Sequence, residues 1–259
     1  LAMKVTNLKA RPMTDADILI APDDRARALK VLLAAGWVSK HPIPVTRYPL
    51  IHSLDLSFHA DGSGLDLHWY ALWDNRQPGA DRAFVEGSVP VSLFQTPTRR
   101  LNDTDLLLHL LAHGGHLSRI PSRRWVADVV ILLRSGATID RQRFIDEAAA
   151  RGLSLQTTAM LTYLVDEFNV PLPDEFIDDL RRVRPGLGER IEYWARERQT
   201  QPWAGGLFHL NTYWRLTRRA HRRLSPTHYL RMWWGVPESS SLAGEALHRL
   251  KHKRTGAIE

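Results

Sequence analysis

The run from Arg11 to Ile20 constrains the fold of this chain more than any other stretch of its sequence. After a turn-forming Arg-Pro pair, residues 15–20 have the pattern of a short strand that becomes wholly apolar at its end. Residues two apart in a strand point to the same side, so Asp15 and Asp17 are expected to share one face. Two carboxylates held side by side repel each other and cost stability unless a cation lies between them. A hard divalent ion such as Mg²⁺ is the natural occupant.

A third carboxylate lies in a similar setting downstream. Asp66 has apolar neighbours on both sides, which is typical of a strand with one face in water. Asp55 has the same flanks, so the residues alone leave open which of the two acids joins the pair. The Asp-Gly-Ser-Gly tetrad at 61–64 predicts a hairpin between strands at 53–59 and 65–72, which would hold Asp66 in register with the sheet. An Asp-x-Asp pair in a loop, with both acids simply hydrated, is the plainer alternative.

The remaining patterns predict a sheet early in the chain and helices after it. An amphipathic helix is expected between Asp23 and Gly36, and residues 74–100 have a loop-rich pattern with one short strand at 89–94. Apolar periodicity then predicts helices at 106–113, 125–133, 139–150, 155–168, 175–182 and 189–199. The predicted fold class is α+β, with a small catalytic core at 1–98 and a mainly helical domain at 99–259.

Composition excludes several classes of protein and points to an acidic partner. The chain has no cysteine, which excludes disulfides and thiolate sites, and no apolar run reaches the roughly 20 residues of a membrane helix. A cytoplasmic location is therefore expected. Residues 181–259 hold 16 Lys+Arg against 6 Asp+Glu, a net charge of +10, whereas residues 1–180 hold 19 against 22, a net charge of −3. The basic C-terminal third favours a nucleic acid, a phosphorylated substrate or an anionic surface as partner.

The segment from Tyr213 to Leu224 predicts a basic helix with tryptophans nearby. Such a segment is typical of a surface that binds nucleic acid through charge and base stacking. A solvated helix whose apolar side packs on the rest of the protein explains the same pattern. We favour the solvated helix, because charge runs are usually solvated faces.

Three histidines, His109, His113 and His116, have spacings that suggest a zinc site. The first two lie four residues apart and would share a helix face. However, no acidic partner stands at the usual spacing, and the Gly114-Gly115 pair would break the helix before the third histidine. We therefore expect His113 to be a polar residue beneath an active site rather than a zinc ligand.

Five segments, taken together, resemble a known superfamily. The segments RPMTDADILI, AGW, LDLHW, HLLAHGGH and RRWVADVVILL occur in an order that is similar to the DNA polymerase β-like nucleotidyltransferases. Within that superfamily they resemble a family of uncharacterised bacterial nucleotidyltransferases often found beside peptide-biosynthesis and polysaccharide genes. The resemblance covers roughly residues 1–150. It implies two Mg²⁺ ions, an NTP as co-substrate, and transfer of a nucleoside monophosphate to an acceptor hydroxyl or phosphate.

The resemblance also implies roles for particular residues. Asp15, Asp17 and Asp66 would bind the metal ions, and the LDLHW segment favours Asp66 over Asp55 as the third acid. The acceptor would be a peptide, protein, sugar or small molecule, or a nucleic acid held by the basic C-terminal segment. Contacts with the nucleotide are expected from Arg11, His68, His113 and Arg124. Arg11 and Arg124 could instead form structural ion pairs.

The start of the chain departs from the superfamily pattern. A Gly-rich turn at a helix N-terminus normally precedes the two aspartates and holds the triphosphate with backbone N–H groups. The sequence opens at Leu1-Ala2-Met3-Lys4, which resembles the helix after that turn, so we expect the chain to be truncated or to have diverged there. The missing turn suggests one alternative, a non-catalytic binding protein that keeps the fold. The basic C-terminal helix suggests another, an RNA- or tRNA-directed transferase or toxin.

Overall fold

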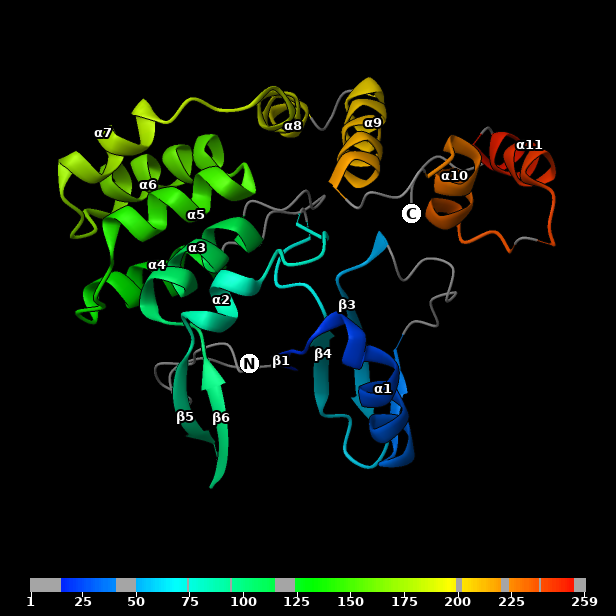
Figure 1. Ribbon diagram of the computed structural model, residues 1–259, viewed down its shortest axis with the longest axis horizontal. Coiled ribbons are helices and arrows are strands. Elements are labelled where there is room, and N and C mark those ends of the chain that lie inside the picture. The colour runs from blue at the N-terminus through cyan, green and yellow to red at the C-terminus, as the bar shows by residue number, and fades with distance from the viewer. Residues whose placement is uncertain are drawn as a thin grey trace.

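The early strands and later helices expected from the sequence are both present in the computed structural model (Figure 1). A four-stranded sheet near the start of the chain is followed by a mainly helical body, so the predicted α+β class is confirmed. The structure describes residues 15–40, 50–73, 75–93, 95–114, 124–198, 202–219, 224–237 and 239–253.

The sheet has the strand order β1-β4-β3-β2. The first strand runs parallel to β4, and the other pairs are antiparallel. The predicted hairpin is present, and the Ser63 N–H donates to Asp61 Oδ1 (2.9 Å) in its turn. Its second strand ends four residues earlier than expected, because the N–H groups of Trp69 and Tyr70 both donate to the carbonyl of His52. The strands are β1 (Asp15–Leu19), β2 (Trp37–Ser39), β3 (Ser53–Phe58) and β4 (Gly64–His68).

One face of this sheet is apolar and is covered by a helix. A short turn of 3-10 helix, η1 (Pro22–Asp24), leads into α1 (Arg25–Ala34), which packs Leu29 and Leu32 on that face. Val31 and Leu33 are exposed instead, so the buried stripe of α1 is narrower than its sequence suggests. The buried side chains of this cluster are Ile51, Leu54, Leu56, Leu65, Leu67 and Trp69.

A second hairpin, which the sequence pattern did not predict, precedes the helical body. It consists of β5 (Val89–Leu93) and β6 (Thr96–Arg100) and follows a short helix, α2 (Arg82–Glu86). The predicted strand at 89–94 corresponds to β5. The domain boundary expected near residue 98 lies inside β6, and the division into two domains stays a prediction.

Nine helices follow in the described part of the chain. The helices predicted between 106 and 199 are present to within a few residues, whereas the predicted basic helix at 213–224 overlaps a longer helix that begins at Pro202. None of them is long and apolar enough to serve as a membrane-spanning segment. They are α3 (Asp103–Gly114), α4 (Arg124–Arg134), α5 (Arg141–Arg151), α6 (Ser154–Phe168), α7 (Asp174–Arg182), α8 (Leu187–Glu197), α9 (Pro202–Arg219), α10 (Pro226–Trp234) and α11 (Leu242–Lys253).

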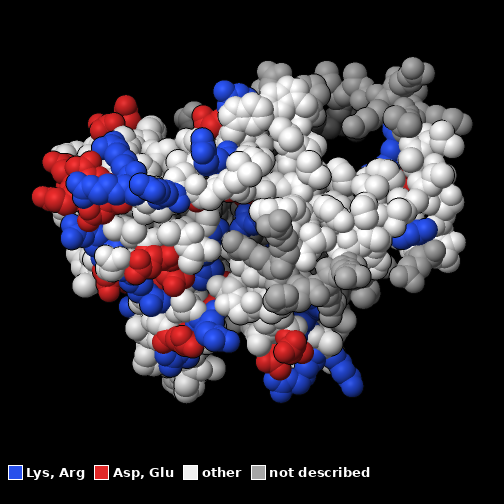
Figure 2. All heavy atoms as spheres, turned by 45° about the horizontal axis from the view of Figure 1, so that its top comes forward, with Lys and Arg blue, Asp and Glu red and all other residues white. Residues whose placement is uncertain are grey.

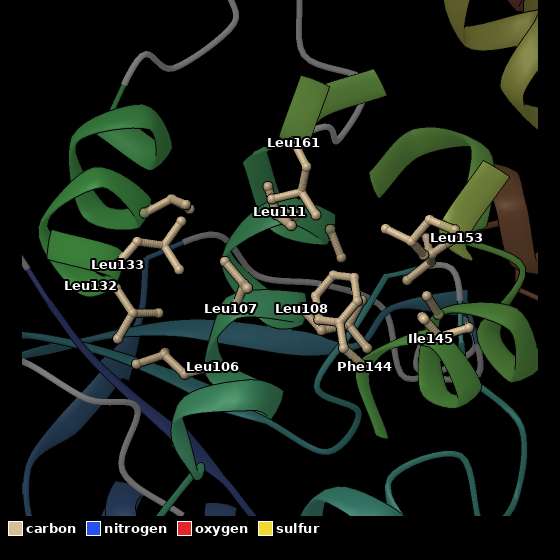
Figure 3. Close-up of a cluster of buried hydrophobic side chains, with 14 of the residues drawn as sticks. Leu106, Leu107, Leu108, Leu111, Leu132, Leu133, Phe144, Ile145, Leu153 and Leu161 are labelled. Atoms are coloured by element: carbon tan, nitrogen blue, oxygen red, sulfur yellow. The ribbon is translucent and has the colours of Figure 1, made fainter. Parts of the chain in front are cut away.

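The core of the helical body is built around α3 (Figure 3). Its Leu107, Leu108 and Leu111 side chains are fully buried, and Phe144 of α5 packs among them. Burying each such side chain contributes about 1.5–3 kcal/mol. Leu19 at the end of β1 packs against the same cluster, so the sheet and the helical body share a contact at the edge strand.

Candidate active site

The register of the sheet brings three acids into one row. Asp17 of β1 lies opposite Asp66 of β4, and Asp66 lies opposite Asp55 of β3. Directly paired residues point to the same side of a sheet, and so do residues two apart in one strand. Asp15 and His68 therefore share this face with the row of acids. It is the face opposite to the one that α1 covers.

The acidic face is turned toward the helical body. Leu19 is two residues from Asp17 and so points to the same side, and its side chain packs against the helical core. Figure 1 shows β1 and β4 on the side of the sheet nearer to α2 and α3. The acids therefore lie where a bound molecule could contact both the sheet and the helices.

Two of the carboxylates and one imidazole form a compact group of donor atoms. One ligand atom from each of Asp17, Asp66 and His68 lies within 4.8 Å of the others. The His68 Nε2 atom is 2.9 Å from Asp66 Oδ2 and 3.5 Å from Asp17 Oδ1. Burial increases across the group, since the Asp17 side chain is 41% exposed, that of Asp66 17% and that of His68 2%. One side of the group is thus open to solvent and the other is anchored in the protein.

The donor atoms fit a divalent cation. The buried Asp66 Oδ1 has no hydrogen-bond partner among the described residues. A buried carboxylate oxygen without a partner is costly, and a metal ion would supply the missing charge. Two carboxylates with an open side also match the way Mg²⁺ binds, through one or two protein carboxylates together with substrate phosphates. Asp17 and Asp66 are therefore the residues that would hold it.

The ionisation of His68 reflects its neighbours. Burial favours the neutral imidazole, but the adjacent carboxylates of Asp17 and Asp66 outweigh burial and raise the pKa of His68 to about 9. The two carboxylates thus favour the protonated ring, whose charge would offset part of theirs.

The two remaining acids on this face differ in position from the donor group. Asp15 is the first residue of β1 and lies outside the compact group, although it shares the face. Asp55 is exposed and lies one strand farther from Asp17 than Asp66 does. The structure thus brings Asp66, rather than Asp55, next to Asp17, and the role of Asp15 stays a prediction.

A set of buried polar residues behind the site was not identified from the sequence. Arg151 of α5 is 3% exposed, and its Nη1 atom lies 3.6 Å from Asp81 Oδ1. Burial raises the pKa of Asp81, and Arg151 opposes that rise. Burial, followed by the charges of His113, His68 and Arg151, holds the pKa of His109 well below its usual value. No local spacing signals this set, because its members lie far apart in the sequence.

The other predicted nucleotide contacts lie on the helical side or outside the described residues. His113 is exposed near the end of α3, and its ring stacks on that of His109 at a centroid distance of 5.7 Å. Arg124 is the exposed first residue of α4. Arg11 and His116 lie outside the described residues, as does the start of the chain. Within the described part, the metal-capable group is the one on the sheet, not the histidines of α3.

The basic C-terminal segment is only partly described. Arg218 and Arg219 end α9, but their side chains, and all of Arg222 and Arg223, lie outside the description. On the face shown in Figure 2, charges of both signs lie side by side over α5–α7, whereas the described surface over the C-terminal helices is mostly uncharged.

That C-terminal region exposes aromatic side chains. Trp194 of α8 and Trp203 of α9 stack at 4.7 Å and are about half exposed. The guanidinium of Arg198 lies 4.9 Å from the centroid of the Trp194 ring. Two tryptophans of α9, Trp203 and Trp214, are exposed rather than buried in the core.

Comparison with known proteins adds one finding to this geometry. No curated protein matches the chain at a significant level. Residues 1–169, which are more than half of the chain and include the sheet and the first helices of the body, match the family described as uncharacterised nucleotidyltransferase. The match confirms the resemblance inferred from the five sequence segments. The chain belongs to this family of nucleotidyltransferases.

Proposed function

We propose that this protein transfers a nucleoside monophosphate from an NTP to an acceptor hydroxyl or phosphate, and that the transfer requires Mg²⁺. The compact group of Asp17, Asp66 and His68 on the open face of the sheet carries the proposal. Family membership supports the reaction class, and the unpartnered Asp66 Oδ1 supports metal binding. Asp15, on the same face, would complete the set of acids.

The acids act by position and charge. Asp17 and Asp66 would hold the metal ion against the triphosphate, and the partly exposed Asp66 carboxylate would take the acceptor proton. Bound Mg²⁺ supplies charge neutralisation of the phosphates and lowers the pKa of the acceptor hydroxyl. The acceptor oxygen then attacks the α-phosphorus in line, the bond from that phosphorus to the bridging oxygen breaks, and pyrophosphate leaves with the electron pair. Most of the rate enhancement comes from this positioning and charge neutralisation.

Calorimetric titration of each of the four NTPs, with and without Mg²⁺, tests the proposal. We expect one or more NTPs to bind only with Mg²⁺, and binding to be lost in the Asp17→Asn/Asp66→Asn double variant. Asp55→Asn is the matched control, because Asp55 lies beside Asp66 on the same face but outside the donor group. That variant should bind like the wild type.

Two results would count against the proposal. Binding that is unchanged in the double variant would place the nucleotide elsewhere. Failure of the folded wild type to bind any of the four NTPs would favour the non-catalytic alternative, a protein that keeps the fold without the reaction.

RNA is a second candidate for the acceptor. The half-exposed Trp194–Trp203 stack with Arg198 beside it has the chemistry of a base-stacking surface, and it lies in the basic C-terminal third. We expect RNA affinity to fall steeply with salt and to drop when Arg218, Arg219, Arg222 and Arg223 are neutralised together. Retained affinity in that variant would exclude the basic segment as an RNA site.

A further inference from the structure

His68 offers a third metal-ligand atom, which Mg²⁺ binding by Asp17 and Asp66 does not require. It ends β4 and is 1% exposed, and its Nε2 lies within ion-pairing distance of both Asp17 and Asp66. Neither ring nitrogen has a directed hydrogen bond among the described residues. Buried imidazoles are normally hydrogen-bonded, so one that faces two carboxylates without such a bond has the position of a metal ligand.

We propose that His68 binds the same divalent ion as Asp17 and Asp66, and that this nitrogen donor makes the site select Mn²⁺ over Mg²⁺. The inference rests on the proposed function: Mg²⁺ supports transfer through the two carboxylates, and the imidazole makes Mn²⁺ the ion that the same site binds more tightly. Asp17 and Asp66 alone would suit either ion, so the selectivity lies with His68.

Ligand chemistry explains the selectivity. Mg²⁺ demands a near-octahedral shell of oxygen atoms, and it gives up its waters reluctantly. Mn²⁺ accepts carboxylate oxygens, and as a transition metal it also gains from an imidazole nitrogen. Zn²⁺ binds imidazole more tightly, but its usual shell of four ligands leaves one position after three protein donors, which is too few for a triphosphate and an acceptor. The donor set therefore fits Mn²⁺ with several positions left for phosphate and water.

A competing role for His68 makes the opposite prediction. As an imidazolium that merely neutralises the two acids, the ring would repel a divalent ion. Its removal would then tighten metal binding, whereas removal of a ligand weakens it. The same substitution therefore distinguishes the two roles.

Pulsed EPR of the Mn²⁺-loaded full chain tests the proposal without an activity assay. We expect echo modulation from a directly bound nitrogen in the wild type, a change in its frequencies when the histidines carry ¹⁵N, and its loss in His68→Leu. His52→Leu is the matched control, because the His52 ring lies 5.1 Å from that of His68 but outside the donor group. Its spectrum should keep the nitrogen coupling. If His68→Leu folds poorly, the ¹⁵N-labelled wild type still shows whether a histidine binds the ion, and His68→Gln, compared with His52→Leu, shows whether that histidine is His68.

Affinities give a second readout. His68→Leu should weaken Mn²⁺ binding about tenfold or more, and should change Mg²⁺ binding by less than about threefold. His68→Gln, which replaces the nitrogen by an oxygen donor, should bring the two affinities closer together. A wild-type spectrum without nitrogen coupling, or tighter Mn²⁺ binding by His68→Leu, would overturn the assignment.

Failure of this inference can be told apart from failure of the proposed function. Mn²⁺ binding that needs Asp17 and Asp66 but shows no nitrogen coupling would remove His68 as a ligand and leave the acid site intact. Mn²⁺ binding that is unchanged in the Asp17→Asn/Asp66→Asn variant would remove both proposals.

Discussion

The acids of the sheet and a buried acid of the helical body have opposite surroundings. Asp105 of α3 is fully buried, yet both its carboxylate oxygens are paired. Arg143 donates to Oδ1 from Nε (2.9 Å) and to Oδ2 from Nη2 (2.7 Å), and Asn102 donates to Oδ2 (2.8 Å). On the sheet, by contrast, Asp66 has one buried oxygen without a partner, and its other oxygen faces an imidazole that it shares with Asp17.

Asp105 is a structural acid, and the sheet acids differ from it in the way expected of a cation site. The pair of Asp105 and Arg143 joins α3 to α5, and Arg143 also donates to the Ala83 carbonyl of α2, so the acid holds three helices together. Asp17 and Asp66 instead share the His68 imidazole, so that group sets two carboxylates against one imidazole. A group that is incompletely neutralised and partly open is arranged to receive a cation.

The largest expected effect is on activity. Asp17→Asn and Asp66→Asn should each lower nucleotidyl transfer about 10³-fold or more, because each removes a metal-binding carboxylate. The fold should persist with a melting temperature near that of the wild type, because relief of the repulsion between the acids offsets the loss of one carboxylate beside His68. Transfer of label from an NTP labelled at the α-phosphate to acceptors in a cell extract, with parallel thermal melts, measures both. Unfolding of both variants would show that Asp17 and Asp66 are structural acids like Asp105.

The next effect is on stability. Arg143→Leu should lower the free energy of unfolding by about 3–5 kcal/mol, because it leaves Asp105 charged and buried without its partner. Denaturant titration measures the loss, and Mg²⁺-dependent NTP binding by the folded fraction should persist. The Asp105→Leu/Arg143→Leu double variant is the control and should recover much of the stability, since no buried charge remains. A double variant as unstable as the single one would show that packing, not charge, explains the loss.

A smaller effect concerns pH. Because the folded-state pKa of His68, about 9, lies above its usual value of 6.5, its protonation stabilises the metal-free protein fully below pH 6.5. That contribution is lost as pH rises toward 9, so the melting temperature in EDTA should fall across this window. Burial and nearby positive charges lower the pKa of His109, so its protonation changes the stability of the protein only at lower pH. A fall of equal size in His68→Leu would assign the pH dependence to other groups.

The smallest effect is expected at Asp55. Asp55→Asn removes an exposed carboxylate from the same row, and its unfolding free energy should stay within about 0.5 kcal/mol of the wild type. Activity should stay within about twofold of the wild type, because a group outside the donor set makes no contact that is specific to the transition state. The label-transfer assay and denaturant titration described above measure the two quantities. A loss of activity as large as that of Asp66→Asn would show that Asp55 also takes part in the transfer.

Local chemistry explains which parts of the fold the sequence predicts. The strand with Asp15 and Asp17, and the hairpin at 61–64, follow from alternation and turn residues, and both are present. The short strand β2 and the strand β6 are missed: three residues are too few for a periodicity, and β6 carries Pro97, which weakens a strand pattern. The register between β1 and β4 depends on a crossover, so no local signal places Asp17 opposite Asp66.

The candidate site, like the fold, is predicted from the sequence only in part. Residue type and spacing suggest Asp66 and Asp55 equally, and only the resemblance favours Asp66. The strand order then explains the choice, because β4 lies between β1 and β3 and puts Asp66 next to Asp17. The proximity of Arg151 to Asp81 arises from packing between a loop and α5, and it has no counterpart in a sequence pattern.

We propose that the acidic face of the sheet, and not the basic C-terminal region, holds the nucleotide and its metal. Diffraction from crystals grown with Mn²⁺ and a non-hydrolysable NTP, recorded for anomalous scattering, tests it most directly. We expect an ion between Asp17 and Asp66, with the triphosphate extending from it toward the helical body. An ordered nucleotide bound elsewhere, with no anomalous peak between these two carboxylates, would contradict it.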